Sequence, residues 1–399
     1  MHTILLQNFK HNMIYYLIYF LFSPILFLII YIGSLFNKKI FKHLKNENRL
    51  FKKVIKKIKN IDRTKIKVLI FHAASAGEFE QLKPILKNID KDKYFIIQTF
   101  TSPTIYEKEK NNTFFNISCY HPYDLWWKSV TFFSRIKPDI YIITRHDLWP
   151  GHILMASIVK SKIFYINANI HLKSVWLNKL CRPFSQYIFR RLTKCLVPSE
   201  KIASIAKKII SKDKIIITGD TRFDQIIDRY EMNKNKKYLP DNFLDTFNII
   251  FGSYDNYDEK IIIDSLASCY PKGSDSLKKL NHKVILVPHE IEKNNLNAMI
   301  KKLQTNFFKP ILFSNIKKSN DMCNLIIIDK VGILADLYKY ATLAYVGSGF
   351  GRGVHSVIEP GVYGCVVSFG PNIEMLDEAK YIYKEHLGIM IKTSNEMND

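Results

Sequence analysis

Several signals that would define other protein classes are missing from this sequence. The six cysteines are widely separated and lack metal-ligand spacing, so they suit a reducing compartment in which several are buried as small apolar side chains. Lys and Arg outnumber Asp and Glu by 59 to 36, yet the cations form no nucleic-acid recognition motif. No nucleic-acid partner is therefore expected. A membrane surface or an acidic substrate accounts better for the clustered cations.

Charge is absent from Met13–Phe36, an apolar stretch that is long enough to cross a bilayer. It is too long for a signal-peptide core and no small-residue cleavage site precedes the basic stretch. Ten cations follow between Lys38 and Lys59, against Lys10 before it, so the positive-inside rule puts the bulk of the chain in the cytoplasm. We expect this basic stretch to lie on anionic lipids. We also expect the apolar segment to act as a tether, and a helix lying in the membrane interface is the alternative geometry.

Short apolar runs alternate with helical, Lys-rich segments beyond residue 60, which predicts an α/β protein with parallel sheets covered by helices on both faces. The expected strands include Tyr94–Gln98, Ile140–Ile143, Ile163–Ile166, Lys194–Val197, Lys214–Thr218, Phe247–Phe251, Lys283–Val287, Leu325–Ile328 and Leu343–Val346. The length favours two domains, with the polar segment from Arg229 to Asp241 as linker. We predict an anchor over 1–60 and Rossmann-like domains over 61–228 and 242–399 that face a cleft.

One dense motif follows a buried strand at Val68–Phe71. The small residues from Ala73 to Gly77 allow a tight turn at the carboxyl end of that strand, where open α/β sheets bind ligands. Glu78 comes where the next helix should begin. It is either a functional carboxylate or a helix N-terminal acid that favours the helix dipole, and the spacing alone does not distinguish the two.

A second dense motif is the glycine-rich loop of Gly347–Gly353, after a predicted strand. It matches neither the dinucleotide fingerprint in its usual place nor a Walker A loop. Its backbone N–H groups could approach an anion, and Arg352 could add a planar donor fork to a phosphate. A short helix is expected to start near His355, which places Glu359 to accept hydrogen bonds from ribose hydroxyls. A purely structural turn is the alternative.

The ordered set of motifs resembles the 3-deoxy-D-manno-octulosonic acid (Kdo) transferase family over almost the whole chain. The matching segments are Ala74-Ser75-Ala76-Gly77-Glu78, His121-Pro122-Tyr123-Asp124, Lys137-Pro138-Asp139, Asp147-Leu148-Trp149-Pro150, Thr218-Gly219-Asp220-Thr221-Arg222-Phe223-Asp224, Phe251-Gly252-Ser253, Gly347–Gly361 and Phe369-Gly370-Pro371. This resemblance implies a GT-B fold and an inverting transfer of Kdo from CMP-Kdo to the lipid A precursor, lipid IVA. It implies no metal and no cofactor, and a place at the inner membrane with the catalytic domains on the cytoplasmic side.

The resemblance also assigns roles to individual residues. Glu78 takes the place of the catalytic base, and Asp147 keeps the second acid of a Glu-x-Glu-Leu-Trp-Pro segment. An alternative for Asp147 is a strand-end acid that caps the helix after Pro150. Ser75, Gly77 and Arg145 fall on the acceptor side. The positions associated with the donor are Ser253, Gly347, Ser348, Gly349, Gly351, Arg352, Gly353, His355 and Glu359.

The chain departs from the family pattern at three places. Arg145 replaces the first acid of the Glu-x-Glu segment, His289-Glu290 stands where many members have Arg-His, and Ser356 replaces Asn. Two other function classes therefore stay open. One is another GT-B protein, either a glycosyltransferase that uses a UDP-sugar or a sugar-nucleotide epimerase, although an epimerase would need no anchor. The other is a non-catalytic protein that binds lipid surfaces.

Overall fold

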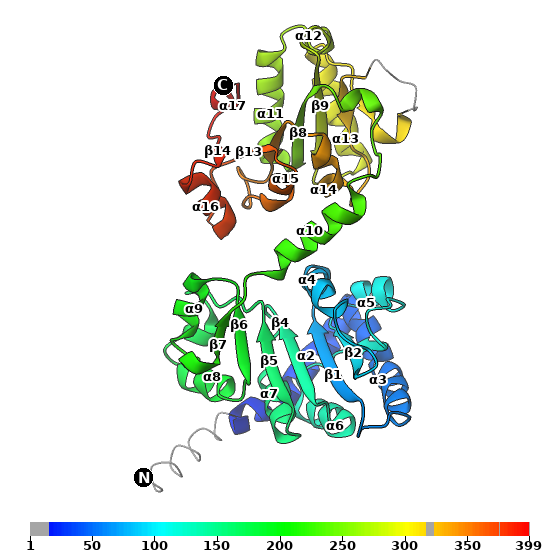
Figure 1. Cartoon of the computed structure of the whole chain (residues 1–399), viewed down its shortest axis with the longest axis vertical. Coiled ribbons are helices and arrows are strands. Elements are labelled where there is room, and N and C mark those ends of the chain that lie inside the picture. The colour runs from blue at the N-terminus through cyan, green and yellow to red at the C-terminus, as the bar shows by residue number, and fades with distance from the viewer. Residues whose placement is uncertain (1–15, 317–322, 375, 399) are drawn as a thin grey trace. The chain divides into compact units, whose positions relative to one another are not determined.

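The computed structural model describes residues 16–316, 323–374 and 376–398, which fall into two compact units, 1–225 and 226–399 (Figure 1). Each unit is built on a seven-stranded sheet in which the paired strands are parallel. Parallel strands need crossover connections, and the helices between them supply these and cover the sheet faces. The α/β prediction with two sheets is confirmed.

The sheet of the first unit has the order β3-β2-β1-β4-β5-β6-β7. Its strands are β1 (Lys67–Ala73), β2 (Tyr94–Phe100), β3 (Ile117–Tyr120), β4 (Ile140–Thr144), β5 (Lys162–Ile166), β6 (Lys194–Val197) and β7 (Ile215–Ile217). Its helices are α2 (Ser23–Phe36), α3 (Lys38–Ile58), α4 (Ala76–Leu86), α5 (Pro103–Glu109), α6 (Trp126–Ile136), α7 (Pro150–Ile158), α8 (Arg182–Phe189) and α9 (Glu200–Ala206), with 3₁₀ turns at Val175–Leu177 and Lys212–Lys214. The central strand β1 is buried from Val68 to Ala73, as expected for a strand covered on both faces.

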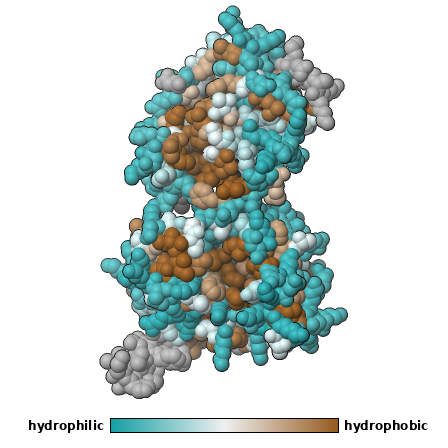
Figure 2. All heavy atoms as spheres, viewed as in Figure 1, coloured by the Kyte–Doolittle hydropathy of each residue, from teal (hydrophilic) through white to brown (hydrophobic). Residues whose placement is uncertain are grey.

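The sheet of the second unit has the order β10-β11-β9-β8-β12-β13-β14. Its strands are β8 (Phe247–Tyr254), β9 (His282–Pro288), β10 (Ile311–Leu312), β11 (Leu325–Ile327), β12 (Leu343–Val346), β13 (Val366–Phe369) and β14 (Gly388–Met390). Its helices are α11 (Asn256–Cys269), α12 (Ser274–Leu280), α13 (Lys293–Thr305), α14 (Leu334–Leu337), α15 (Ile358–Val362), α16 (Asp377–Lys384) and α17 (Ser394–Asn398), with 3₁₀ turns at Asp241–Phe243, Phe313–Asn315 and Tyr338–Tyr340. On the face shown in Figure 2, hydrophilic side chains make up most of the outline of each unit.

The segment expected to be a linker is half helical. Helix α10 (Thr221–Asn233) crosses the division between the two units, and an irregular stretch follows it up to Asp241. The second half of α10 is fastened within the second unit, where Arg229 and Asn233 hydrogen-bond the buried carboxylate of Asp336. The polar composition that predicted a loop reflects the exposed face of this helix instead.

Four strands have no counterpart among the expected ones named above: β3, β10, β13 and β14. Strand β10 has only two residues, and the other three contain a serine or glycine, so none of them shows a continuous apolar run of the expected length. The cysteines agree with the prediction, because all six are free thiols and Cys119, Cys195, Cys323 and Cys365 are buried.

Candidate active site

The first candidate site lies at the carboxyl ends of β1 and β4, which are neighbours in the sheet although β2 and β3 separate them in sequence. The strand order changes direction at this point, and open α/β sheets bind their ligands in the crevice that such a switch creates. Two of the predicted residues come together here: Glu78 on the first turn of α4 and Asp147 just after β4. The Asp147 carboxylate is close enough to affect the ionisation of Glu78.

Glu78 is a capping-box residue as well as the candidate base. Ser75 caps α4 by accepting from the Glu78 backbone N–H, and Oε2 of Glu78 accepts from the N–H groups of Ala74 (2.6 Å) and Ser75 (3.1 Å). The helix-terminus interpretation is therefore realised in the structure. It does not exclude the functional one, because these bonds fix the carboxylate through one of its two oxygens.

The environment of Glu78 shifts its ionisation toward that of a base. Burial raises the pKa of the carboxyl above its ordinary value, and Asp147 acts in the same direction. The nearby His72 imidazole and the two backbone N–H groups oppose the shift without cancelling it. A carboxylate with a raised pKa accepts a proton more readily near neutral pH, as general-base catalysis requires.

Asp147 is held by three side chains and does not cap the following helix. Its Oδ2 accepts from Nε2 of His72 (2.7 Å) and from the Thr101 hydroxyl (3.0 Å), and its Oδ1 accepts from the indole N–H of Trp149 (2.8 Å). Burial acts to raise the pKa of Asp147, but these contacts outweigh it and leave the pKa below its ordinary value. Helix α7 begins without a side-chain cap. The alternative that made Asp147 a capping acid is therefore wrong.

His72 is a site residue that the sequence analysis did not single out. Its ring is fully buried in β1, with Nδ1 3.0 Å from Oγ1 of Thr99 and Nε2 on Asp147. It stacks on His121 at 4.0 Å between ring centroids, and His121 meets His152 edge to face at 4.3 Å. Burial lowers the pKa values of His121 and His152, so these two rings carry little charge at neutral pH.

Two of the predicted acceptor-side residues, Gly77 and Arg145, belong to the segments that carry this pair of carboxylates. Gly77 lies in the first turn of α4 rather than in the preceding loop, and a Cβ built on it would meet no atom within 4 Å. Arg145, directly after β4, has a left-handed backbone (φ 61°), and its Nε donates to the His146 ring at 3.1 Å. Strained backbone of this kind concentrates at functional sites.

The apolar N-terminal segment is more than a tether. Within the described part of the chain, Tyr16–Phe36 forms a helix long and apolar enough to cross a membrane; Met13 to Tyr15 lie outside the described residues. The Tyr16 hydroxyl donates to the carbonyl of Pro150 (3.0 Å), and the Tyr19 hydroxyl donates to Oδ2 of Asp124 (2.7 Å). The helix is thus bonded to the start of α7, three residues after Asp147.

Only one face of this helix packs on the first unit. Tyr16 and Ser23 are buried, and Phe27 contacts Trp127 at 5.9 Å between ring centroids. Large apolar side chains on the remaining surface are exposed: Leu17, Ile18, Leu21, Phe22, Ile25, Leu28, Ile29, Ile32, Leu35 and Phe36. A helix with one face on the protein and an apolar face left open has the form of an interfacial helix.

The second candidate site lies at the corresponding switch point of the other sheet, at the carboxyl ends of β8 and β12. Ser253 and Ser348 both adopt left-handed backbone there, with φ of 54° and 67°. Gly347 is required by close approach, because a Cβ would lie 2.3 Å from the Cα of Tyr254. Gly349 packs against Gly370 in the same way, because a Cβ on Gly349 would lie 2.5 Å from the backbone nitrogen of Gly370.

Most amides of the glycine-rich loop are already engaged. Asp258, a fully buried residue of α11, accepts from the N–H groups of Ser348 (2.5 Å) and Phe350 (3.4 Å), and from the Tyr345 hydroxyl (2.8 Å). The N–H groups of Gly351 and Gly353 donate to the carbonyl of Ser348. The expected cradle of backbone N–H groups is thus largely closed around an internal carboxylate, which leaves side chains as the main donors to a ligand.

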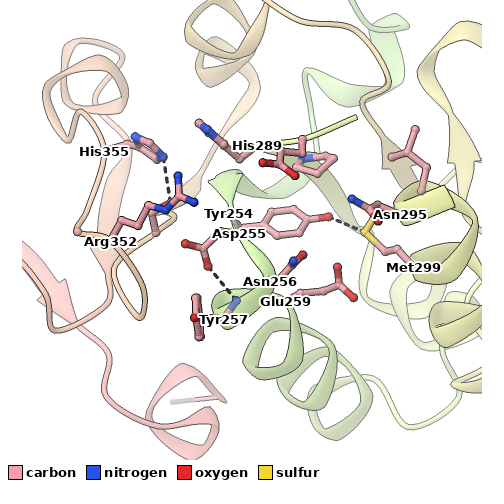
Figure 3. A pocket seen from close by; sticks show the side chains of 15 residues that line it. Tyr254, Asp255, Asn256, Tyr257, Glu259, His289, Asn295, Met299, Arg352 and His355 are labelled. Carbon is pink, nitrogen blue, oxygen red and sulfur yellow. Dashed lines mark hydrogen bonds between the residues drawn. The ribbon is translucent and has the colours of Figure 1, made fainter. Parts of the chain in front are cut away.

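A pocket opens beside this loop, and Figure 3 shows its lining. Four of the predicted donor residues line it: Ser348, Arg352, Gly353 and His355. Ser253 is not among the lining residues, but its hydroxyl lies 3.0 Å from Nδ1 of His289. His289 itself lines the pocket, although the sequence analysis recorded it only as a departure from the family pattern.

Glu359 lies apart from the residues that line this pocket. The helix expected near His355 begins at Ile358 and has five residues, so Glu359 is its second residue. Burial raises the pKa of Glu359, while Arg229 of α10 acts to lower it. Arg229 and Asp336 are the charges that act on Glu359, and a ribose contact by Glu359 stays a prediction.

Comparisons with known proteins point to one family of similar sequences. The family described as 3-Deoxy-D-manno-octulosonic-acid transferase (kdotransferase) matches residues 44–225. A 3-deoxy-D-manno-octulosonic acid transferase of Rickettsia bellii is 25% identical over 403 residues, covering 96% of this chain and 88% of the relative. The transferase of the same name from Aquifex aeolicus is 28% identical over 330 residues, covering 82% of each chain.

Among solved structures, UDP-GlcNAc 2-epimerase from Methanocaldococcus jannaschii superposes with a TM-score of 0.55 at 17% identity, over 84% of this chain and 90% of the other. That likeness concerns the fold alone. Two parallel seven-stranded sheets, each with residues gathered at its switch point, define a GT-B protein. Within the GT-B class, the ordered motifs and the sequence relatives indicate one family. The chain is similar to the Kdo transferase family over most of its first unit, and to individual Kdo transferases over most of its length; these relatives are glycosyltransferases.

Proposed function

We propose that this enzyme transfers Kdo from CMP-Kdo to the lipid A precursor, lipid IVA, in lipopolysaccharide synthesis, with inversion at the anomeric carbon. The observation that carries the proposal is Glu78, a buried carboxylate with a raised pKa at the switch point of a domain that matches the Kdo transferase family. The names of the sequence relatives support Kdo as the transferred sugar.

In this mechanism Glu78 removes the proton from the acceptor hydroxyl as the new bond forms. A sugar hydroxyl is a poor nucleophile at neutral pH, so proton removal in the transition state lowers the barrier. The backbone N–H groups of Ala74 and Ser75 keep the carboxylate in place through Oε2. Asp147 stays ionised and is oriented by His72, Thr101 and Trp149. Its charge helps to keep the pKa of Glu78 raised.

We assign the donor nucleotide to the pocket of the second unit. The leaving group carries a single phosphate, so a few cations and hydroxyl donors can stabilise its charge. Arg352 offers a planar donor fork, while His355, His289 and Ser348, which also line the pocket, supply further donors. Ser253 supports this set by hydrogen-bonding His289.

We propose that the enzyme lies at the inner membrane, held there by the apolar helix, with both units on the cytoplasmic side. We favour an interfacial position, since Tyr16 and Tyr19 bind the first unit while the opposite face of the helix is exposed and apolar. The cations from Lys38 to Lys59 lie along α3, directly after the apolar helix, and would lie on anionic headgroups. This position brings the enzyme to the surface that holds its lipid acceptor.

Mass spectrometry of lipid IVA incubated with CMP-Kdo and membranes containing this protein tests the proposal. A mass gain of one or more Kdo residues is expected, and the number of additions is read directly. Because the fold is shared with a UDP-GlcNAc 2-epimerase, calorimetry with CMP and UDP is the second arm. Tighter binding of UDP than CMP, together with unchanged lipid IVA, would move the protein to the UDP-sugar class.

A further inference from the structure

Two imidazoles lie face to face in the pocket of the second unit. His289 follows β9 and His355 follows the glycine-rich loop, and their rings stack at 5.0 Å between centroids with an interplanar angle of 13° (Figure 3). Each ring is held by a serine hydroxyl: Ser253 lies 3.0 Å from Nδ1 of His289, and Ser348 lies 3.0 Å from Nε2 of His355. Both serines belong to the left-handed backbone at the switch point.

The remaining charges of the pocket do not favour an anion. From the segment after β8 come Asp255, Tyr257 and Glu259, from the segment after β9 comes Glu290, and from the glycine-rich loop comes Arg352. Glu259 is neutralised by Lys302 of α13, at 2.7 Å. Asp258 lies behind the loop and is engaged by its amides. With neutral imidazoles, Arg352 alone therefore faces the two carboxylates Asp255 and Glu290.

We propose that His289 and His355 form a proton-linked phosphate site: the pair takes up a proton when the phosphate of the nucleotide donor binds, so that donor affinity falls as pH rises. This inference rests on the proposed function, because it takes the nucleotide donor as the ligand of this pocket. The proton supplies the positive charge that the pocket lacks. An imidazole is the side chain that can gain it near neutral pH.

The serine partners suit such a change of charge. A hydroxyl can donate to the bare nitrogen of a neutral imidazole and can accept from the N–H of a charged one, so protonation costs neither ring its hydrogen bond. In the first unit, by contrast, Nε2 of His72 is bound to the Asp147 carboxylate inside a buried column. His289 is exposed and His355 is half-buried, so both rings can be reached by a ligand.

The stacking limits the uptake to about one proton. Burial lowers the pKa of His355, His289 lowers it further, and Asp255 and Asp258 oppose the shift. Two charged rings face to face would repel each other, so the second proton is disfavoured. A phosphate that bridges the two rings would stabilise the first proton, and binding and protonation are then linked.

The test is calorimetric titration of the full-length protein in detergent with the methyl ester of CMP. This ester keeps a single phosphate charge between about pH 5.5 and 8.5, whereas the second ionisation of CMP itself falls near pH 6. On the alkaline side we expect the Kd to rise by up to about tenfold per pH unit, the limit for uptake of one proton. His289→Arg supplies a permanent cation at the same place, so it should bind the ester with a much flatter pH dependence. His289→Gln combined with His355→Gln removes both rings, so this double variant should bind at low pH as weakly as the wild type does at high pH.

His282→Arg is the matched control, because His282 lies at the opposite end of β9 from His289. It should keep the wild-type pH dependence. A Kd that does not change with pH in the wild-type protein would overturn the inference, and so would an unchanged slope in His289→Arg. Failure to bind the CMP ester at any pH, with binding of the UMP ester retained, would overturn the proposed donor and the inference with it.

Discussion

The Tyr19 hydroxyl of the apolar helix donates a 2.7 Å hydrogen bond to the carboxylate of Asp124, 105 residues further along the chain. The same carboxylate accepts from the backbone N–H of Gly151 (2.8 Å) and from the Ser129 hydroxyl (2.8 Å). Since Gly151 lies in the first turn of α7, the apolar helix is linked to the segment that carries Asp147. This link makes the helix part of the first unit.

Tyr19→Phe should therefore reduce turnover without releasing the protein from the membrane. The variant keeps the apolar ring but leaves Asp124 short of one donor, at a cost of about 1–3 kcal/mol. Activity on detergent-dispersed lipid IVA is the measurement, with kcat expected to fall more than the KM for CMP-Kdo changes. Tyr31→Phe is the control, because Tyr31 is an exposed residue of the same helix. Equal activity of the two variants would mean that the helix acts only as a tether.

Glu78→Gln should lower turnover by roughly 10²-fold or more while the protein remains folded. Glutamine keeps an acceptor for the N–H groups of Ala74 and Ser75, so the capping box can survive, but it cannot take up a proton. Glu80→Gln is the control, because Glu80 lies on the same helix and pairs with Lys83 at its surface. If Glu78→Gln keeps activity within a few-fold of the wild type, Glu78 is not the catalytic base and serves only to cap α4.

The acid limb of the pH–activity profile should report the same carboxyl. Because burial raises the pKa of Glu78, the base is lost by protonation as pH falls through that raised value. The value of kcat/KM should therefore increase with pH across this limb, at a pH above the ordinary range of glutamate. If the acid limb of the profile has the same midpoint in Glu78→Asp as in the wild type, the titrating group is not Glu78.

Gly77→Ala tests whether Gly77 takes part in binding the acceptor, independently of any effect on the stability of the protein. A Cβ at this helical position meets no atom within 4 Å, so the protein should be as stable as the wild type or gain up to about 1 kcal/mol from helix propensity. If the open space beside Gly77 receives the acceptor, the KM for lipid IVA should rise while CMP binding stays unchanged. Unchanged kinetics would remove Gly77 from the acceptor site.

Asp336→Asn should loosen the end of α10 in the second unit. Asp336 is 3% exposed and accepts from Arg229 (3.0 Å), Asn233 (3.2 Å) and Tyr238 (2.6 Å). Burial acts to raise its pKa, but these hydrogen bonds and the Arg229 charge leave the pKa below the ordinary value. The stabilisation is therefore present above the unfolded-state pKa and is lost as pH falls through the lower folded-state value.

Hydrogen exchange of the amides in α10 and α14 measures this effect. At pH 7 the variant should lose about 1–3 kcal/mol of protection, and the difference should shrink as pH falls below about 4. Asp241→Asn, which breaks an exposed pair with Lys237, is the control and should change little. Equal loss in both variants would mean that the buried network adds nothing specific.

The sequence by itself determined the class of fold and the places of the two sites. The run Val68–Phe71 and the runs after it predict parallel strands, because a strand covered on both faces is apolar throughout. Carboxyl ends of parallel strands meet at one edge of a sheet, so the order of residues alone assigns Glu78 and the Gly347–Gly353 loop to ligand-binding edges. Short strands such as β14 carry too few residues for that argument.

Only the tertiary structure decided which side chains meet at these edges. His72 and Asp147 are 75 residues apart in the sequence, and Ser253 and His289 are 36 apart. No local sequence pattern can therefore predict either contact. The engagement of the loop amides by Asp258 likewise depends on how α11 packs beneath the loop. Local spacing sets strand and helix, whereas contacts between distant residues are set by sheet order, register and the packing of helices on the sheet. For this reason the anchor helix, expected as a tether, proved to be bonded to the segment that carries Asp147.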